Sequence, residues 1–221
     1  MAHRTLRWLK VFPIFLMRQR TARLRDTMLR YSKLILCALA IVGCRATAPE
    51  SVIVEQQAFW ASLQQLCGSA YRGQVVQASP ADTVFTGKAL IMHVRHCSNE
   101  AMHIAFNAGD DRSRTWILTR TDHGMRLKHD HRHPDGSEDA ITQYGGDTRT
   151  TGEPTRQEFY ADAHTAELIP AAANNVWTIE IVPNRLFSYA LRREGTDRRF
   201  RVEFDITRAV ATPPPSWGHP D

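Results

Sequence analysis

Residues 112–147 read RSRTWILTRTDHGMRLKHDHRHPDGSEDAITQYGGD, and two turn signals divide this stretch into strand-length segments. The turns are Asp122-His123-Gly124 and Pro134-Asp135-Gly136-Ser137. Glycine accepts positive φ, proline presets φ, and Asp and Ser side chains bond the local backbone. Residues 125–133, between the turns, are long enough for one strand. The stretch therefore predicts three antiparallel strands joined by these two turns.

The predicted strand 125–133 carries different chemistry on its two faces, because successive side chains of a strand alternate. One face begins apolar and ends in imidazoles: Met125, Leu127, His129, His131 and His133. The other face, which we expect to be solvated, is charged: Arg126, Lys128, Asp130 and Arg132. The first face is typical of a stripe that rises from a core toward the mouth of a cavity.

The first turn decides which residues of the preceding strand share the histidine face. If residues 122–124 all belong to the turn, Thr121 pairs with Met125 and Thr115 lies opposite His131. The residues on the other face would then be Arg114, Trp116, Leu118 and Arg120. This register predicts a basic outer face and places Thr115 beside the histidines.

The second turn brings the third strand alongside the histidines. If His133 faces Ala140, Thr142 lies beside His131 and Tyr144 beside His129. A slip of one residue in this longer turn would instead place Ile141 and Gln143 there. The candidate ligand-binding residues on the shared face are Thr115, His129, His131, Thr142 and Tyr144.

The three histidines are also candidate metal ligands. Neutral imidazole is the commonest metal ligand, and two histidines at positions i and i+2 of a strand can share one zinc ion. At ~3.3 Å per residue, His129 and His133 stand about 13 Å apart, so only a neighbouring pair, with His131, would bind. Three interpretations stay open: a transition-metal site such as zinc, a ligand pocket, or a polar hairpin with histidines bonded to hydroxyls.

The net charge of +5 belongs to the N-terminal segment. Residues 1–43 hold nine of the 28 Lys and Arg but one of the 23 Asp and Glu, so the remainder carries a net charge of −3. A basic balance confined to a leader gives no reason to expect a nucleic-acid partner.

Residues 28–43 are typical of a secretory signal peptide, with a short basic region followed by an apolar run too short to cross a membrane. Residues 1–27 fit poorly before it, so we interpret them as a gene-model extension or an atypical leader. Ile41-Val42-Gly43-Cys44 resembles the bacterial lipobox, which implies cleavage before Cys44 and diacylation of its thiol. Arg45 follows in place of the aspartate that favours inner-membrane retention. The resemblance thus implies a lipid anchor in the outer membrane or on the periplasmic face. An ordinary signal peptide with a nearby cut is the alternative.

Two cysteines, Cys67 and Cys97, follow the predicted anchor. An exported chain with two remaining cysteines most simply pairs them, because its compartment is oxidising. The alternative is a reactive thiol at Cys97 that is activated by His93.

The rest of the chain predicts one domain, rich in strands. Residues 44–52 read as a tether, and 54–66 show helical spacing before the stop signal Gly68. Short strands at regular spacing then fill a single domain over 53–208, and 209–221 form a Pro-rich tail. The predicted strands outside the opening stretch are 73–78, 88–96, 101–106, 156–161, 176–182, 186–193 and 199–206. About ten antiparallel strands after one helix favour an all-β, up-and-down barrel, with a β-sandwich as the alternative.

This organisation is similar to the calycin group of barrels, which includes lipocalins, fatty-acid-binding proteins and nitrobindin-type barrels. Tyr71-Arg72-Gly73-Gln74 stands where lipocalins have Gly-x-Trp. FWxxLxxLCG (59–68), RSRTWILTR (112–120), HDHRHPDGSED (129–139) and YGGDT (144–148) resemble a group of uncharacterised bacterial secreted proteins and lipoproteins. That resemblance implies export and a single domain, and it implies no activity.

No hydrolase elbow, zinc-protease motif, phosphate loop or dinucleotide fingerprint occurs in the sequence. Our leading hypothesis is a lipid-anchored envelope protein that binds a small molecule at the histidine end of the barrel. The first alternative is a metal-dependent hydrolase or lyase that uses two of the three histidines. The second is a structural protein that meets anionic partners through Arg114, Arg120, Arg126 and Arg132.

Overall fold

The computed structural model describes residues 50–80 and 82–220. The predicted leader (1–27), signal peptide (28–43), lipidation site Cys44 and most of the tether lie outside these residues. One helix, α2 (Glu50–Gln64), precedes ten strands. The strands are β1 (Ala70–Ala78), β2 (Leu90–Cys97), β3 (Ala101–Ala108), β4 (Asp111–Thr121), β5 (Gly124–His131), β6 (Tyr144–Asp147), β7 (Arg156–Ala161), β8 (Asn175–Val182), β9 (Leu186–Arg193) and β10 (Arg199–Val210).

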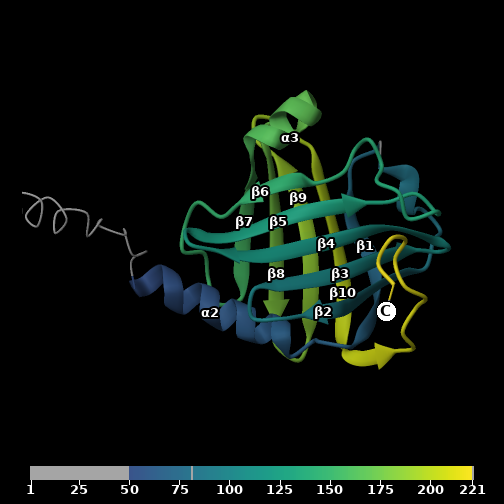
Figure 1. The fold of residues 1–221 in the computed structure, drawn as a ribbon, viewed down its shortest axis with the longest axis horizontal. Coiled ribbons are helices and arrows are strands. Elements are labelled where there is room, and N and C mark those ends of the chain that lie inside the picture. Colours follow the sequence, from purple (N-terminus) through teal and green to yellow (C-terminus); the bar gives the residue numbers. More distant parts are fainter. Residues whose placement is uncertain (1–49, 81, 221) are drawn as a thin grey trace, which may run out of the picture. The chain divides into compact units, whose positions relative to one another are not determined.

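The strands form a closed antiparallel barrel (Figure 1). Each strand pairs with the next along the chain, and β10 returns to pair with β1. The predicted up-and-down barrel is therefore confirmed, and the sandwich alternative is wrong. Three short helical segments interrupt the connections: η2 (Thr83–Phe85), α3 (Ala163–Leu168) and η3 (Pro170–Ala172).

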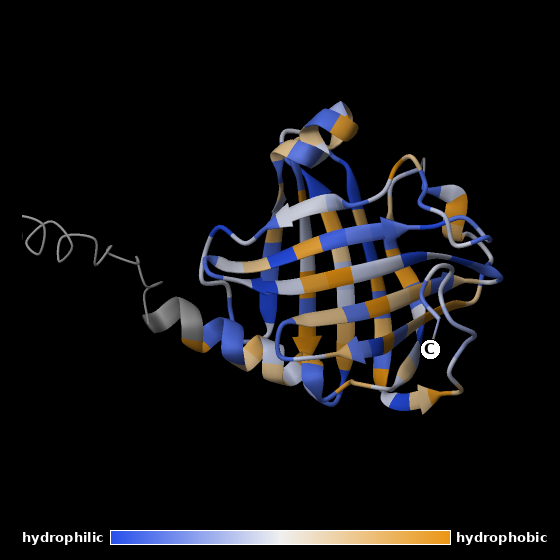
Figure 2. Ribbon diagram, in the orientation of Figure 1, coloured by the Kyte–Doolittle hydropathy of each residue, from blue (hydrophilic) through white to orange (hydrophobic). Residues whose placement is uncertain are grey.

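Alternate side chains of the strands fill the barrel, and the ribbon colours alternate accordingly in Figure 2. The pattern is clearest in β10, where Phe200, Val202, Phe204 and Ile206 are buried between charged residues. None of the described helices is long and apolar enough to cross a membrane.

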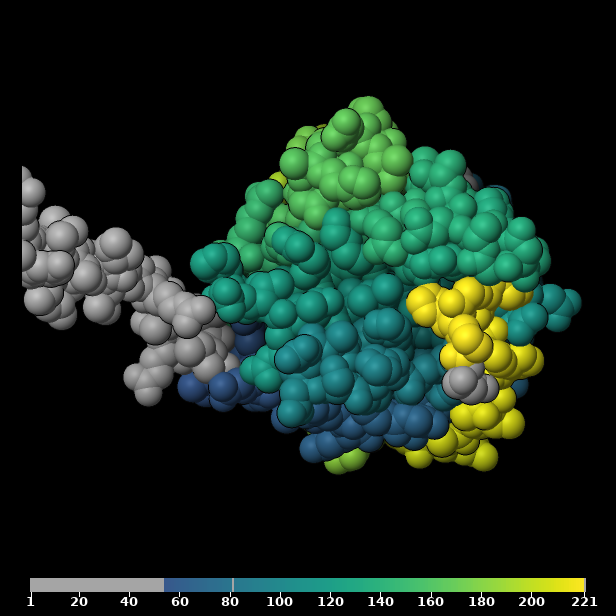
Figure 3. Space-filling model, in the orientation of Figure 1, coloured from purple at the N-terminus to yellow at the C-terminus, as the bar shows by residue number. Residues whose placement is uncertain are grey.

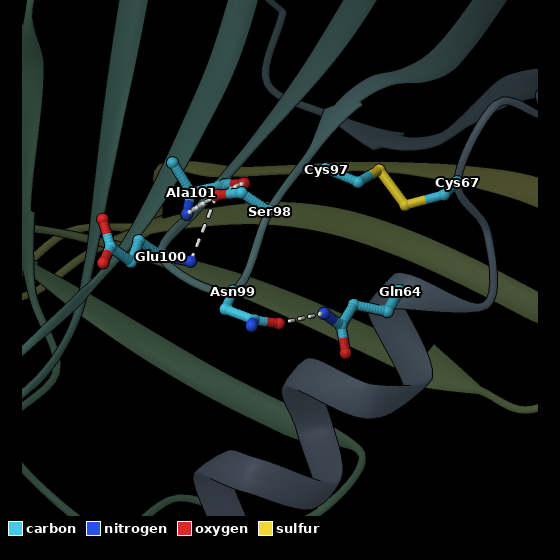
Figure 4. Close-up of a disulfide and its surroundings, with 7 residues drawn as sticks. All are labelled: Gln64, Cys67, Cys97, Ser98, Asn99, Glu100 and Ala101. Carbon is cyan, nitrogen blue, oxygen red and sulfur yellow. Dashed lines mark hydrogen bonds between the residues drawn. A yellow bond between two sulfur atoms is a disulfide. The ribbon is translucent and has the colours of Figure 1, made fainter.

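Helix α2 plugs one end of the barrel, against β5, β7 and β8. Its fully buried side chains include Phe59, Trp60 and Leu63. The predicted disulfide is confirmed: Cys67, after α2, is bonded to Cys97 at the end of β2, with Cα atoms 6.2 Å apart (Figure 4). Nearby, Gln64 Nε2 donates to Asn99 Oδ1 at 3.4 Å. The disulfide thus ties the plug to the barrel wall.

The predicted register of β4 and β5 is wrong by one residue. Thr121 pairs with Gly124, so the turn holds two residues, and Trp116 rather than Ile117 lies opposite His129. The observed register buries Trp116, of which 2% is exposed, and large apolar side chains gain most from burial. Thr115 consequently pairs with Asp130 and lies on the outer face.

The second hairpin agrees with the prediction at one position and differs at another. Tyr144 pairs with His129, as predicted. Thr142 precedes β6, and its hydroxyl accepts from the backbone N–H of His131 at 2.8 Å instead of meeting the imidazole. Gln143 stands between them at φ 56°, a left-handed conformation that breaks the strand pattern before Tyr144.

The expectation that the outward face of β5 is wholly solvated is also wrong, because the C-terminal tail covers part of it. Residues 215–220, the strap, lie across the outer surface of the β2–β5 region (Figure 3). Arg95 Nη1 donates to the His219 carbonyl at 2.7 Å, and His219 Nε2 is bonded to Asp130. Asp130 and Thr115 are therefore almost completely buried, at 0% and 3% exposure.

Candidate functional site

A small cavity of about 120 Å³ lies at the barrel end away from α2. It collects three of the predicted site residues, His129, His131 and Tyr144, whereas Thr115, Thr142 and His133 do not line it. Its remaining lining residues are Asp82, Phe85, Phe106, Arg114, Trp116, Tyr189, Leu191, Arg198 and Phe200. The walls are mostly aromatic, and the polar atoms come from a few side chains.

His129 sits at the inner side of this cavity and is held from both ring nitrogens. Its Nδ1 lies 3.0 Å from the Tyr144 carbonyl oxygen and its Nε2 lies 2.7 Å from the Tyr189 hydroxyl. Burial lowers the pKa of His129 to about 3, so the ring is neutral at pH 7. A carbonyl only accepts, so Nδ1–H donates to it and Nε2 accepts the Tyr189 proton. Both nitrogens are therefore used within the protein.

Tyr189 and Trp116 form the flat wall of the cavity. Their rings stack with centroids 4.4 Å apart at 9°, and Phe106 stacks on the other side of Trp116 at 4.9 Å and 20°. Burial raises the pKa of Tyr189 well above its usual value, so its hydroxyl stays protonated. The hydroxyl gives its proton to His129, so its oxygen can still accept a bond from a ligand.

His131 and Tyr144 form the second polar pair. The Tyr144 hydroxyl lies 3.2 Å from His131 Nε2. Burial, reinforced by the charge of Arg114, lowers the pKa of His131 to about 4, and burial raises the pKa of Tyr144 to about 12. Both groups are neutral at pH 7. The second ring nitrogen of His131 has no hydrogen-bond partner among the described residues, so it is available to a ligand.

Segment 82–85 covers the cavity from outside the barrel. The Phe85 ring lies 5.3 Å from both Phe106 and Phe200. Asp82 accepts two hydrogen bonds from Arg198, at 2.6 and 2.7 Å, which fixes the segment to the start of β10. The planar guanidinium fits a carboxylate in this two-bonded geometry.

Sequence reasoning missed nine of the twelve lining residues, among them Asp82, Phe85, Tyr189 and Arg198. Tyr189 had a signal, because it continues the inward alternation of Phe187 in β9. The other three meet the cavity only after the barrel closes, and no spacing in the sequence marks them.

No protein-family model matches this sequence, and no curated protein is significantly similar to it. Function must therefore come from the chemistry of the site, since a barrel fold hosts many functions.

The histidines do not fit a metal centre. A catalytic zinc needs about three protein ligands, yet both nitrogens of His129 are bonded to tyrosine groups and His133 is exposed outside the cavity. Within residues 50–80 and 82–220, no group of three or more His, Cys, Asp and Glu side chains is placed to hold a metal ion. We therefore derive no step through zinc or another transition metal.

The four arginines expected on one outer face are divided between two faces and mostly neutralised. Arg114 and Arg120 share the inward side of β4 with Trp116; Arg114 pairs with Asp111, and Arg120 lies 5.6 Å from the Trp60 ring. Arg126 and Arg132 point outward. Arg126 forms an ion pair with Asp147, and Arg132 forms ion pairs with Asp130 and Glu138. This arrangement does not favour a basic docking face there.

Proposed function

We propose that the protein is an exported, lipid-anchored binding protein of the bacterial cell envelope. It holds a small, uncharged ring compound in the polar end of its barrel. The observation that carries the proposal is the cavity of about 120 Å³, lined by the stacked Trp116 and Tyr189 rings and by His131, one ring nitrogen of which forms no hydrogen bond among the described residues. Its polar groups are neutral hydrogen-bonding side chains set around a flat aromatic wall, an arrangement suited to binding.

The size of the cavity limits the ligand to about one ring. An apolar cavity of roughly 150 Å³ in another protein accommodates benzene, so a cavity slightly smaller suits a ring of five or six atoms. The stacked walls favour a planar molecule, because aromatic rings pack best in offset-stacked or edge-on contact. A larger molecule would have to displace Phe85.

Because the polar side chains of the cavity are neutral or already paired, they favour a ligand that is uncharged and can form hydrogen bonds. His129, His131, Tyr144 and Tyr189 are all uncharged at pH 7. Arg114 and Arg198 are each paired with an aspartate. An unpaired charge on the ligand would be desolvated without a partner, which is costly. A hydroxyl or carbonyl group on the ring would satisfy the open nitrogen of His131.

The disulfide supports the proposed location. Disulfides persist in oxidising compartments and are rare in the cytosol, so the Cys67–Cys97 bond favours an exported protein. The lipobox resemblance at Cys44 supplies the proposed membrane attachment.

Calorimetric titration with phenol tests the proposed site. We expect one phenol per protein, an affinity at least tenfold lower for His131→Ala, and unchanged affinity for the matched control His133→Ala, whose side chain is exposed. Cyclohexanol, which has the hydroxyl but no flat ring, is expected to bind more weakly than phenol. Equal binding by the His131→Ala variant and the native protein would refute the proposal.

A further inference from the structure

The seam between β1 and β10 is interrupted on the outside of the barrel. Tyr71 pairs with Ala209, but the next paired residue of β1, Gly73, pairs with Phe204. Four residues of β10, from 205 to 208, thus stand opposite the single residue Arg72. Gly73 allows the strands to approach below this point, because a Cβ there would lie 2.5 Å from the Phe204 ring. Such bulges are over-represented beside functional sites.

The bulge lines an open cleft of about 760 Å³. This is within the usual range of ligand sites and several times the volume of the cavity at the mouth. Leu186, Ala209 and Val210 supply apolar surface in the cleft, beside its charged residues. The two sites lie toward opposite ends of β9, since Leu186 lines the cleft and Leu191 the mouth, about 16 Å apart along the strand.

Three exposed arginines from separate segments line this cleft: Arg72 in β1, Arg185 before β9 and Arg208 in β10. None of them forms an ion pair with a described carboxylate. Elsewhere, arginines of the described chain do pair with acids: Arg114, Arg126, Arg132, Arg156, Arg192, Arg198 and Arg201. The cleft therefore gathers three guanidinium groups that form no ion pair, against two carboxylates in its lining.

Two carboxylates also line the cleft, and each is already engaged. Glu203 accepts from Arg201 at 2.7 Å. Asp205 accepts from the backbone and hydroxyl of Thr207, at 2.9 and 2.6 Å. Hydrogen bonds from Thr207, with a smaller contribution from the charge of Arg208, lower the pKa of Asp205. Arg208 thus feels this charge but makes no ion pair with it, and the three guanidinium groups keep their donors open.

We propose that this cleft binds a phosphate-bearing ligand. Guanidinium groups bind phosphate with two parallel hydrogen bonds, and their fixed fork makes arginine better suited to this than lysine. The volume of the cleft exceeds that of a single phosphate, and its apolar surface fits an organic group esterified to the phosphate. Two sources share this chemistry: a free phosphate ester and the headgroup of a phospholipid.

The test compares the native chain with a triple variant, Arg72→Gln, Arg185→Gln and Arg208→Gln, and with the exposed single variant Lys88→Gln as charge control. The soluble probe is glycerol 3-phosphate, followed by NMR titration. The membrane probes are vesicles of phosphatidylcholine with and without phosphatidylglycerol, followed by co-sedimentation. All samples for the vesicle measurement carry Cys44→Ala, so that no lipid on that residue contributes.

Binding of glycerol 3-phosphate that falls at least tenfold in the triple variant, but not in Lys88→Gln, supports a free phosphate ester as ligand. Extra binding to phosphatidylglycerol vesicles that the triple variant loses, with no binding of the soluble probe, supports a lipid headgroup. In either case Arg→Lys replacements at the same positions are expected to restore only part of the affinity. Absence of both, or binding equal in the native chain and the triple variant, overturns the proposal.

Discussion

The two ends of the barrel interior use the same inward strand positions for different purposes. At one end, α2 inserts Phe59, Trp60 and Leu63 and the interior is apolar. At the other end, His129 and His131 continue the inward face of β5 that Met125 and Leu127 form near the plug. The plugged end therefore supplies stability, while the other end keeps neutral polar groups around the small cavity at some energetic cost.

Phe59→Ala tests the plugged end and has the largest expected effect. Phe59 is fully buried, so its truncation should lower the free energy of unfolding by about 3–5 kcal/mol. Denaturant unfolding measures this loss. Phenol affinity per folded molecule is expected to stay the same, and a strong loss of affinity would show that the two ends are not independent.

Removal of the disulfide by Cys67→Ser and Cys97→Ser weakens the same end. The cysteines are 30 residues apart, and the chain-entropy model gives about 3–4 kcal/mol for a loop of this length. Thermal unfolding of the native and double-variant proteins, each with its phenol titration, provides the comparison. A change in phenol affinity without a change in stability would contradict the division between the ends.

Acidification probes the polar end through His129. Its pKa is lowered to about 3 in the folded protein, so below its unfolded pKa the unfolded state binds more protons. The contribution of His129 to stability is therefore fully present above about pH 6.5 and is lost as the pH falls toward 3. With an unfolded pKa near 6.5, His129 should account for about 2 kcal/mol of loss between pH 7 and pH 5. Denaturant unfolding at both pH values should show a smaller loss for His129→Gln, and an equal loss would contradict the assignment.

Tyr144→Phe has the smallest expected effect on stability. It keeps the ring stacked on His129, with centroids 4.5 Å apart, and removes the hydroxyl beside His131. The expected cost is about 1 kcal/mol, the usual net contribution of one hydrogen bond. The variant should alter phenol binding more than Phe59→Ala does, although it destabilises the protein less. The reverse order of effects on phenol binding would contradict the proposed division between a stabilising end and a binding end.

The sequence predicted the barrel, the leading helix and the disulfide, because period-two alternation, turn residues and cysteine number are local signals. The predicted position of Thr115 was wrong because the sequence Asp122-His123-Gly124 fits a turn of two residues as well as a turn of three. Only the burial of Trp116 distinguishes the two registers. Local sequence patterns could not predict the burial of Asp130 either. It depends on a strap 89 residues away in the chain, whose own sequence predicted only a Pro-rich tail.

A crystal structure of the protein grown with phenol would show whether the polar end of the barrel is a ligand site. We expect the phenol ring against Trp116 and Tyr189, with its hydroxyl bonded to the free nitrogen of His131 and segment 82–85 still closed over it. A cavity that remains filled by its own side chains, with phenol absent or bound elsewhere, would contradict the claim that this end of the barrel is a ligand site.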